Sequence, residues 1–309
     1  MKIKNLFYPL SLAMAAMTLT ACSSTEGEEA VTAETAEAVS QTGTFQVSIN
    51  VGPAQTRAIS VGGNDGHTLY TNWDKNDEVQ VVKEGATTIA GTLTANVSAG
   101  NSAYATLTGT LSGTFAVNDQ VTLYYHSANI DYTGQKGTLP DVSTNKSFLT
   151  ATSTVQQIGL DDGTVKDGST KYLVMSNASY DAMQAYLDIT FTDTGGNPLA
   201  ITKLEVWTSA GKLVKTAPLD GQTVYATDAS PLTITPDAAT DHFFLALRDE
   251  AGTSNTIYFK ATTAGDTYIY SQNLELEYGE YYYAASPKTM KRNPNSSAKN
   301  YIWNTPTEE

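Results

Sequence analysis

Apolar and polar residues alternate along much of this chain, most regularly at residues 45–51. Large apolar residues are separated there by single polar residues, and a period of two predicts a strand with one buried face. The apolar positions are Phe45, Val47, Ile49 and Val51. The same period, or short runs of β-branched and aromatic residues, predicts further strands. They span 78–82, 104–108, 121–125, 172–175, 186–191, 201–207, 242–247, 256–260, 267–270 and 274–278.

Turn-forming residues separate these predicted strands. Gly, Asp and Asn cluster at 62–66, 161–163, 194–198, 249–252 and 264–266. A strand spacing of about 10–15 residues is typical of β-sandwiches and not of βαβ units. A terminal hairpin is expected from 274–278 and 281–285, and only 179–186 shows helical character. The pattern therefore predicts an all-β fold.

Chain length, together with the similar strand and turn pattern of the two halves of the sequence, predicts two domains. The 309 residues suffice for two domains of ~150 residues, and the strand pattern divides near residue 180. We predict tandem β-sandwich-like domains at 44–180 and 181–292. A C-terminal tail, 293–309, follows them.

Composition narrows the class of protein. Asp and Glu number 32 against 18 Lys and Arg, which gives a net charge of −14. Nucleic-acid binding requires clustered Lys and Arg, so no nucleic-acid partner is expected. Apolar residues make up 40% of the chain, enough for a packed core. A single cysteine excludes a disulfide framework and a cysteine-based zinc site. The composition is typical of a secreted all-β protein.

The start of the chain resembles the signal sequence of a bacterial lipoprotein. Two lysines precede an apolar stretch at 6–21, which is too short, and too interrupted by Pro9, for a membrane span of ~20 residues. The stretch leads into the sequence LTAC, which ends at Cys22 and resembles a lipobox. The resemblance implies a signal peptide at 1–21 and acylation of Cys22, which would anchor the chain stably. The alternatives are an ordinary signal peptide with a chance cysteine and a buried structural cysteine.

Residues 22–43 are expected to form an acidic, flexible spacer. Five glutamates lie there among Ser, Thr and Ala, a composition that does not support a packed core. Acidic residues soon after a lipidated cysteine resemble the surface-export signal of Bacteroidota lipoproteins. A solvated tether without a targeting role is the alternative.

Several later segments occur in an order typical of one protein family. They are Thr56-Arg57-Ala58 after the first strand, NWDKNDEV at Asn72–Val79, AYLDITF at Ala185–Phe191, ITKLEVW at Ile201–Trp207 and LEYGEYY at Leu276–Tyr282. No single motif is specific. Their order after a lipobox resembles the fimbrillin family, the type V pilins of Bacteroidota surface fimbriae, over nearly the whole chain. The resemblance implies two tandem β-sandwich-like domains of transthyretin-like, Greek-key type.

The resemblance also implies a processing step. In polymerising members of the family, an Arg-specific protease cuts after an arginine in the loop that follows the first strand, and that strand then leaves. Arg57 holds the matching position, so a cut between Arg57 and Ala58 is implied, with loss of the strand at 45–51. Exposed loops are where proteolysis concentrates; an ordinary surface arginine is the alternative. The implied partners are copies of this chain or related fimbrial subunits in a head-to-tail polymer, an Arg-specific surface protease, and outer-membrane lipid through Cys22 before processing.

A strand that replaces 45–51 is expected near the end of the chain. Residues 298–305 predict a short strand in which Tyr301 and Trp303 share one face and Ile302 takes the other. We hypothesise that this segment is the donor strand of the polymer. An ordinary last strand packed on its own domain is the alternative.

The sequence contains no recognisable catalytic, metal or cofactor motif. His67, His126 and His242 lie far apart, without the spacing of a metal site or a hydrolase. The acidic loop at 161–168 lacks the residue order of a calcium loop. Paired glycines occur only in turns without a following helix, so no phosphate-binding loop is expected. We expect no catalytic residues, no metal, no cofactor and no enzymatic activity.

The favoured function is a structural fimbrial subunit that supports adhesion to host or bacterial surface ligands. It would be a lipid-anchored precursor at the cell outer membrane and later part of the fimbrium. Alternatives are a non-polymerising anchor or tip subunit and a surface-anchored glycan-binding lipoprotein. The aromatic residues that could stack on sugars are Trp73, Tyr124, Tyr125, Trp207, Tyr281, Tyr282, Tyr283 and Trp303. In strands, such residues more often form core.

Overall fold

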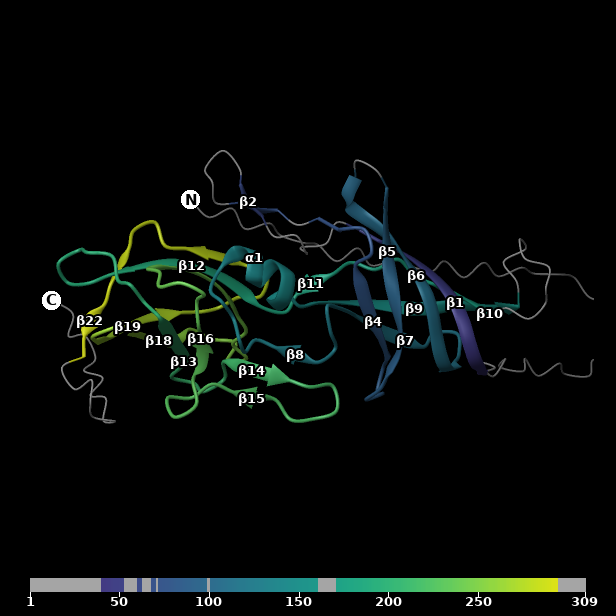
Figure 1. Ribbon diagram of the computed structural model, residues 1–309. Coiled ribbons are helices and arrows are strands. Elements are labelled where there is room, and N and C mark those ends of the chain that lie inside the picture. Colours follow the sequence, from purple (N-terminus) through teal and green to yellow (C-terminus); the bar gives the residue numbers. More distant parts are fainter. Residues whose placement is uncertain are drawn as a thin grey trace, which may run out of the picture. The chain divides into compact units, whose positions relative to one another are not determined.

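The computed structural model describes residues 40–52, 60–62, 68–70, 72–98, 101–160 and 171–293 (Figure 1). Several predicted features lie outside these residues: the signal peptide, Cys22, most of the spacer, Arg57, Ala58, and the tail segment with Tyr301, Ile302 and Trp303. They remain predictions. No helix in the described part of the chain is long and apolar enough to cross a membrane.

The first group of strands forms a sheet that closes on itself. Its members are β1 (Gln41–Val51), β4 (Glu78–Lys83), β5 (Ile89–Ser98), β6 (Asn101–Phe115), β7 (Gln120–Tyr125), β9 (Leu149–Leu160) and β10 (Lys171–Met175). Neighbours are hydrogen-bonded in the order β10-β1-β6-β5-β4-β7-β9, and β9 also pairs with β10. The result is a closed seven-stranded barrel, whereas the sequence predicted a two-sheet sandwich. Alternation predicts which residues are buried, but not which distant strands pair.

The period-two pattern itself is present in the barrel. On β7, Val121, Leu123 and Tyr125 are buried, while the residues between them are half-buried. These buried side chains of β7 belong to one apolar cluster, to which β1, β4, β5, β6, β9 and β10 also contribute. Burial of one face per strand therefore stabilises the barrel through the hydrophobic effect.

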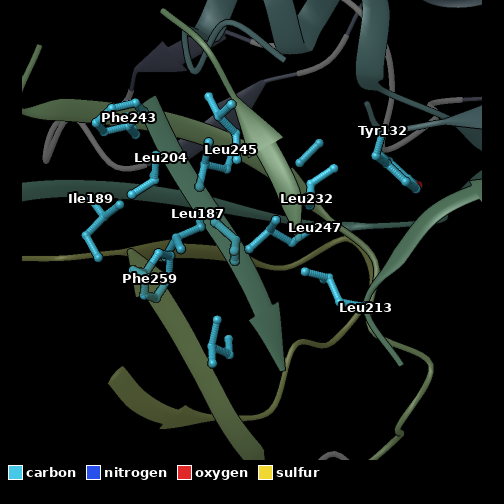
Figure 2. Close-up of a cluster of buried hydrophobic side chains, with 14 of the residues drawn as sticks. Tyr132, Leu187, Ile189, Leu204, Leu213, Leu232, Phe243, Leu245, Leu247 and Phe259 are labelled. Carbon is cyan, nitrogen blue, oxygen red and sulfur yellow. The ribbon is translucent and has the colours of Figure 1, made fainter. Parts of the chain in front are cut away.

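Two further sheets share a second core. One contains β17 (His242–Leu247), β12 (Ala185–Thr192), β20 (Tyr281–Tyr283) and β21 (Lys288–Thr289); the other runs β16 (Leu232–Ile234), β13 (Lys203–Thr208), β18 (Asn255–Thr262), β19 (Thr267–Leu274) and β22 (Lys291–Arg292). Side chains from both sheets, among them Leu187, Leu245 and Phe259, pack in one cluster (Figure 2). Tyr132 belongs to this cluster although it precedes β9 in the chain.

The remaining described elements are short. They are β2 (Ser60–Gly62), β3 (Thr68–Tyr70), β8 (Ile130–Asp131), β11 (Asp181–Ala182), β14 (Val214–Ala217), β15 (Val224–Tyr225), the helix α1 (Leu139–Asp141) and the π-helical turn η1 (Val142–Lys146). β11 adds to β9 beside the barrel. Thr138 begins α1, because its hydroxyl accepts a hydrogen bond from the backbone N–H of Asp141 at 3.3 Å.

Helical character was expected in the wrong segment. Residues 179–186 form β11 and the start of β12, and the helical turns lie at 139–146. Ala178, Tyr180 and Ala182 are all buried, so a period of two prevails here over the helix propensity of the Ala, Met and Gln residues. Tertiary burial commonly overrides such weak local preferences.

The expected terminal hairpin is also wrong. β19 continues to Leu274 and pairs with β18, whereas β20 pairs in parallel with β12. The chain between them crosses from one sheet to the other, and Gly279 (φ +82°) donates its backbone N–H to Gln184 O at 2.8 Å. The stretch after 287, for which the sequence predicted no strand, contributes β21 and β22 around the fully buried Met290. The strands β2, β3, β5, β8, β9, β11, β14, β15 and β16 were not predicted either.

Candidate functional site

The strand β1 occupies an interior position of the barrel, between β6 and β10. It is antiparallel to β6 along its full length, from Gln41 opposite Phe115 to Val51 opposite Ala105. On its other edge, residues 45–48 run parallel to 171–174. We call this position between β6 and β10 the β1 slot. Removal of β1 would leave two strand edges with unpaired backbone groups, which are costly when water is excluded.

The apolar face of β1 is buried as the alternation predicted. The exposed fractions are 0% for Phe45, 4% for Val47, 0% for Ile49 and 2% for Val51. Across the β1–β6 ladder these four residues lie opposite Leu111, Gly109, Leu107 and Ala105. The four side chains are therefore part of the barrel core and not a covering over it.

The opposite face of β1 is polar and joined to β6 by side-chain hydrogen bonds. The hydroxyls of Thr42 and Thr114 lie 2.7 Å apart, and Thr106 donates to Asn50 Oδ1 at 3.1 Å. Both pairs are exposed. Cross-strand pairs of this kind contribute a fraction of 1 kcal/mol each, about 0.2–1 kcal/mol.

Two lysines cover the aromatic end of the slot. Lys171 Nζ lies 5.7 Å from the centre of the Phe45 ring and donates to Thr42 O at 2.9 Å. Lys83 Nζ lies 5.8 Å from the Phe115 ring and donates to Thr114 O at 2.9 Å. The two rings meet edge to face, with centres 5.5 Å apart. Neither lysine was singled out from the sequence.

The end of β1 is fastened to the segment after β10. Gly52 N donates to Ala178 O, and Ala178 N donates to Asn50 O, each at 3.2 Å. The next residues, 53–59, are outside the described part of the chain and contain the predicted cut between Arg57 and Ala58. The strand predicted to leave is thus joined directly to the segment predicted to be cut.

The segment around Trp73, one of those that carry the family resemblance, has a structural role. Trp73 is 1% exposed and packs its ring against Tyr125 and Tyr180, with centres 6.0 and 5.5 Å away. The carboxylate of Asp77 accepts from Asp74 N at 2.8 Å, and Asn76 adopts φ +71°. The segment forms the turn that leads into β4.

A second polar cluster lies on β12, β17 and β20. Asp188 Oδ1 lies 2.5 Å from His242 Nε2, and Asp188 Oδ2 accepts from the Tyr281 hydroxyl at 2.8 Å. The hydrogen bond to Asp188 raises the pKa of His242, while partial burial opposes this. Burial and the same carboxylate raise the pKa of Tyr281.

A cavity of about 530 Å³ adjoins this cluster, with Leu139, Pro236 and Phe244 among its apolar residues. The Thr240 hydroxyl, also at this cavity, donates a hydrogen bond to His242 O and accepts one from His242 N, each at 3.2 Å. Within the described residues, no group of three or more His, Cys, Asp and Glu side chains is placed to hold a metal ion.

Of the seven described aromatic residues considered for sugar stacking, three are buried, Tyr124, Tyr281 and Tyr282 are half-buried, and Tyr283 is exposed. Trp73 is 1%, Trp207 4% and Tyr125 1% exposed. Tyr283 is 44% exposed, and Trp303 is outside the described residues. Because both described tryptophans are buried, they do not offer the flat exposed faces that the glycan-binding alternative requires.

No protein-family model matches this sequence, and the curated proteins give no match. Among solved structures, the chain is similar to a provisionally assigned cell adhesion protein from Bacteroides ovatus, with 12% identity, 82% of this chain and 96% of that chain covered, and a TM-score of 0.40. The fimbrial anchor protein Mfa2 from Porphyromonas gingivalis is 13% identical over 75% of this chain and 83% of its own, with a TM-score of 0.34. The tip fimbrial protein Mfa3 from the same organism is 12% identical over 75% and 82%, with a TM-score of 0.32.

Proposed function

We propose that this protein is a structural subunit of a cell-surface fimbria that supports adhesion. It is exported as a lipoprotein precursor acylated at Cys22, cut after Arg57, and polymerised by exchange of β1 for an extended segment of another subunit. The observation that supports this proposal is the placement of β1. It is an interior strand with a buried apolar face, and its chain continues directly into the segment that contains Arg57.

The energetics favour exchange of β1 over its simple loss. Four buried side chains at roughly 1.5–3 kcal/mol each amount to about 6–12 kcal/mol, an upper estimate because unfolded chains already bury some surface. A typical domain is stable by only ~5–15 kcal/mol. A subunit without β1 therefore gains much by accepting another strand, which restores both the backbone hydrogen bonds and the buried side chains.

Strand exchange between copies also explains how a polymer would grow. Each subunit would offer an extended segment to the β1 slot of the next, and a head-to-tail contact that does not close produces a filament. The donor segment predicted from the sequence, 298–305, belongs to this proposal. Before the cut, the acyl chains on Cys22 hold the precursor at the outer membrane.

The N-terminus of the protein recovered from the cell surface tests this function. We expect intact mass and N-terminal sequencing to show mature chains that begin at Ala58. Arg57→Ala should abolish the mature form and the polymer, whereas Arg292→Ala, which removes another exposed arginine, should leave both unchanged. Mature chains that begin at acylated Cys22 and retain β1 would contradict the polymer subunit and favour an anchor.

A further inference from the structure

The contacts of β1 define which sequences fit its slot. We propose that the β1 slot selects an extended segment with a glycine, an aromatic residue and then three β-branched residues at alternate positions, and that Lys171 recognises the aromatic ring. This inference rests on the proposed function, because it names the kind of segment that replaces β1. In this chain the pattern is met by Gly43, Phe45, Val47, Ile49 and Val51.

The aromatic position is set by a cation and a second ring. Lys171 Nζ lies 5.7 Å from the centre of the Phe45 ring, and Phe115 meets that ring edge to face at 5.5 Å. A cation is attracted to the face of an aromatic ring, and edge-to-face pairs add to the effect of burial. A leucine would fill much of the same space but would offer neither interaction.

The glycine position is set by the same lysine. Gly43 has φ +158° and lies opposite Gly113, which has φ +146°. A Cβ atom added at Gly43 would lie 3.2 Å from Lys171 Nζ. A larger residue there would require the Lys171 side chain, which contacts Thr42 O and the Phe45 ring, to shift by a few tenths of an ångström.

The three β-branched positions face small or medium residues of β6. Val47 lies opposite Gly109, and a Cβ atom at Gly109 would come within 2.7 Å of Thr92 O. Gly109 therefore stays glycine because β5 approaches closely. Ile49 and Val51 lie opposite Leu107 and Ala105 and are fully buried or nearly so. β-branched residues suit such positions, since they pack well on a pleated surface.

The predicted donor segment fits this pattern poorly. In an extended conformation, one of its faces would carry Lys299, Tyr301, Trp303 and Thr305, and the other Ala298, Asn300, Ile302 and Asn304. Neither face follows a ring with three β-branched residues. The selection rule therefore predicts that a segment with the 41–51 pattern enters the slot more tightly than 298–305 does.

Lys83 provides a matched control for Lys171. It covers Phe115 at 5.8 Å, donates to Thr114 O at 2.9 Å and forms an ion pair with Asp119 at 2.7 Å. These contacts are with β6 and its neighbours and not with β1. Substitution of Lys83 removes a similar lysine from the same end of the barrel without removing the cation above the Phe45 ring.

Peptide exchange measures the selection. Full-length protein carrying Arg292→Lys is nicked with an Arg-specific protease, and uptake of labelled peptides is followed by fluorescence anisotropy. The peptides are 41–51, its Phe45→Leu and Gly43→Val versions, and 298–309. We expect 41–51 to exchange most tightly. Lys171→Met should reduce the preference for Phe over Leu by about two- to fivefold, the effect of one exposed cation–ring contact, and Lys83→Met should leave it unchanged. An unchanged preference in Lys171→Met overturns the inference.

A measurement on the intact chain tests the recognition of the Phe45 ring by Lys171 without requiring strand exchange. Phe45→Leu is introduced into the wild type, Lys171→Met and Lys83→Met, and the equilibrium constant of unfolding is measured in urea. The increase caused by Phe45→Leu should be about two- to fivefold smaller with Lys171→Met and unchanged with Lys83→Met. No coupling to Lys171 overturns the inference, whatever the peptides do. Coupling to Lys171 in a nicked chain that takes up no peptide would contradict strand exchange and leave the ring recognition standing.

Discussion

Strands β1 and β17 each pair with a strand on one edge, but the backbone groups on their other edge find hydrogen-bond partners in different ways. β1 has a strand on each side, β6 and β10. β17 pairs with β12 on one side, and on the other it is capped by the loop before α1. The side-chain amide of Gln135 accepts from Ala246 N at 2.9 Å and donates to Ala246 O at 3.0 Å, and Gly137 O accepts from Phe244 N at 2.9 Å.

The edge of β17 is blocked permanently, because residues of the second core cap it. Gln135 is 0% exposed, and a Cβ atom at Gly137 (φ +72°) would lie 2.6 Å from Phe243, so this cap is built into the second core. An edge blocked by its own chain is protected from pairing with other chains. The edges of β6 and β10 have no such cap among the described residues and are covered by β1 alone. Of the two edges compared, the one beside β17 is blocked by its own loop, whereas the edges beside β1 depend on a strand that another strand could replace.

The largest expected effect is a charge in the buried face of β1. Ile49→Asp places a carboxylate where the exposed fraction is 0%, without a partner of opposite charge. An unpaired buried charge is among the few changes that cost about 4 kcal/mol or more. Urea unfolding followed by tryptophan fluorescence should show loss of the native barrel.

Asn50→Asp is the control for this prediction. It introduces the same side chain one residue later, on the exposed face, where its oxygen still accepts from Thr106. We expect a change within about 0.5 kcal/mol. Similar stability of the two variants would mean that β1 is a covering strand and not part of the core.

The next effect concerns the cap on β17. Gln135→Ala leaves the N–H and C=O of Ala246 without their side-chain partners in a buried site. Each buried group left unsatisfied costs about 1–3 kcal/mol, so for the two groups we expect a loss of about 2–6 kcal/mol and faster hydrogen exchange at Ala246. Gln156→Ala, on an exposed position of β9, should change neither quantity. Unchanged exchange at Ala246 would remove the contrast between the two edges.

The sequence predicts the buried face of β1 but not the strands with which β1 pairs. The local period of two identifies the buried face of β1 from its four apolar residues. This inference requires no knowledge of the partner strands. The parallel pairing of β1 with β10, which closes the barrel, joins residues distant in the chain, and no local pattern carries that information. The sandwich expected for this region was wrong for that reason.

The polar contacts of the site are equally invisible in sequence. Gln135 lies 111 residues from Ala246, and Asp188 lies 54 residues from His242. Lys171 is one of many lysines until the register of β1 places Thr42 and Phe45 beside it. The segment around Ala185–Phe191 was noticed as a family motif, but its Asp188 gained a role only from the pairing of β12 with β17 and β20.

A smaller effect depends on pH at the start of β17. The hydrogen bond from Asp188 raises the pKa of His242 above its usual 6.5. A raised pKa in the folded state means that this group contributes stability below pH ~6.5 and loses it as the pH rises through the folded value. The His242 side chain is 56% exposed, so water screens the pair and we expect less than about 1 kcal/mol.

Urea unfolding between pH 6 and pH 9 measures this contribution. The difference in stability between the wild type and His242→Gln should shrink as the pH rises, because glutamine does not titrate. A difference that stays constant over this range would show that the bond to Asp188 contributes no pH-dependent stability to β17.

The smallest expected effect is on the outer face of β1. Thr42→Val removes the hydroxyl that lies 2.7 Å from that of Thr114 in an exposed pair, but it retains a β-branched side chain suited to a strand. Since exposed cross-strand pairs contribute little, stability in urea should change by no more than about 0.5 kcal/mol. A loss as large as that of Gln135→Ala would mean that polar contacts on the surface hold β1 as firmly as a buried amide caps β17. In that case the two edges would not differ in how permanently they are closed, and release of β1 would require these surface contacts to be broken first.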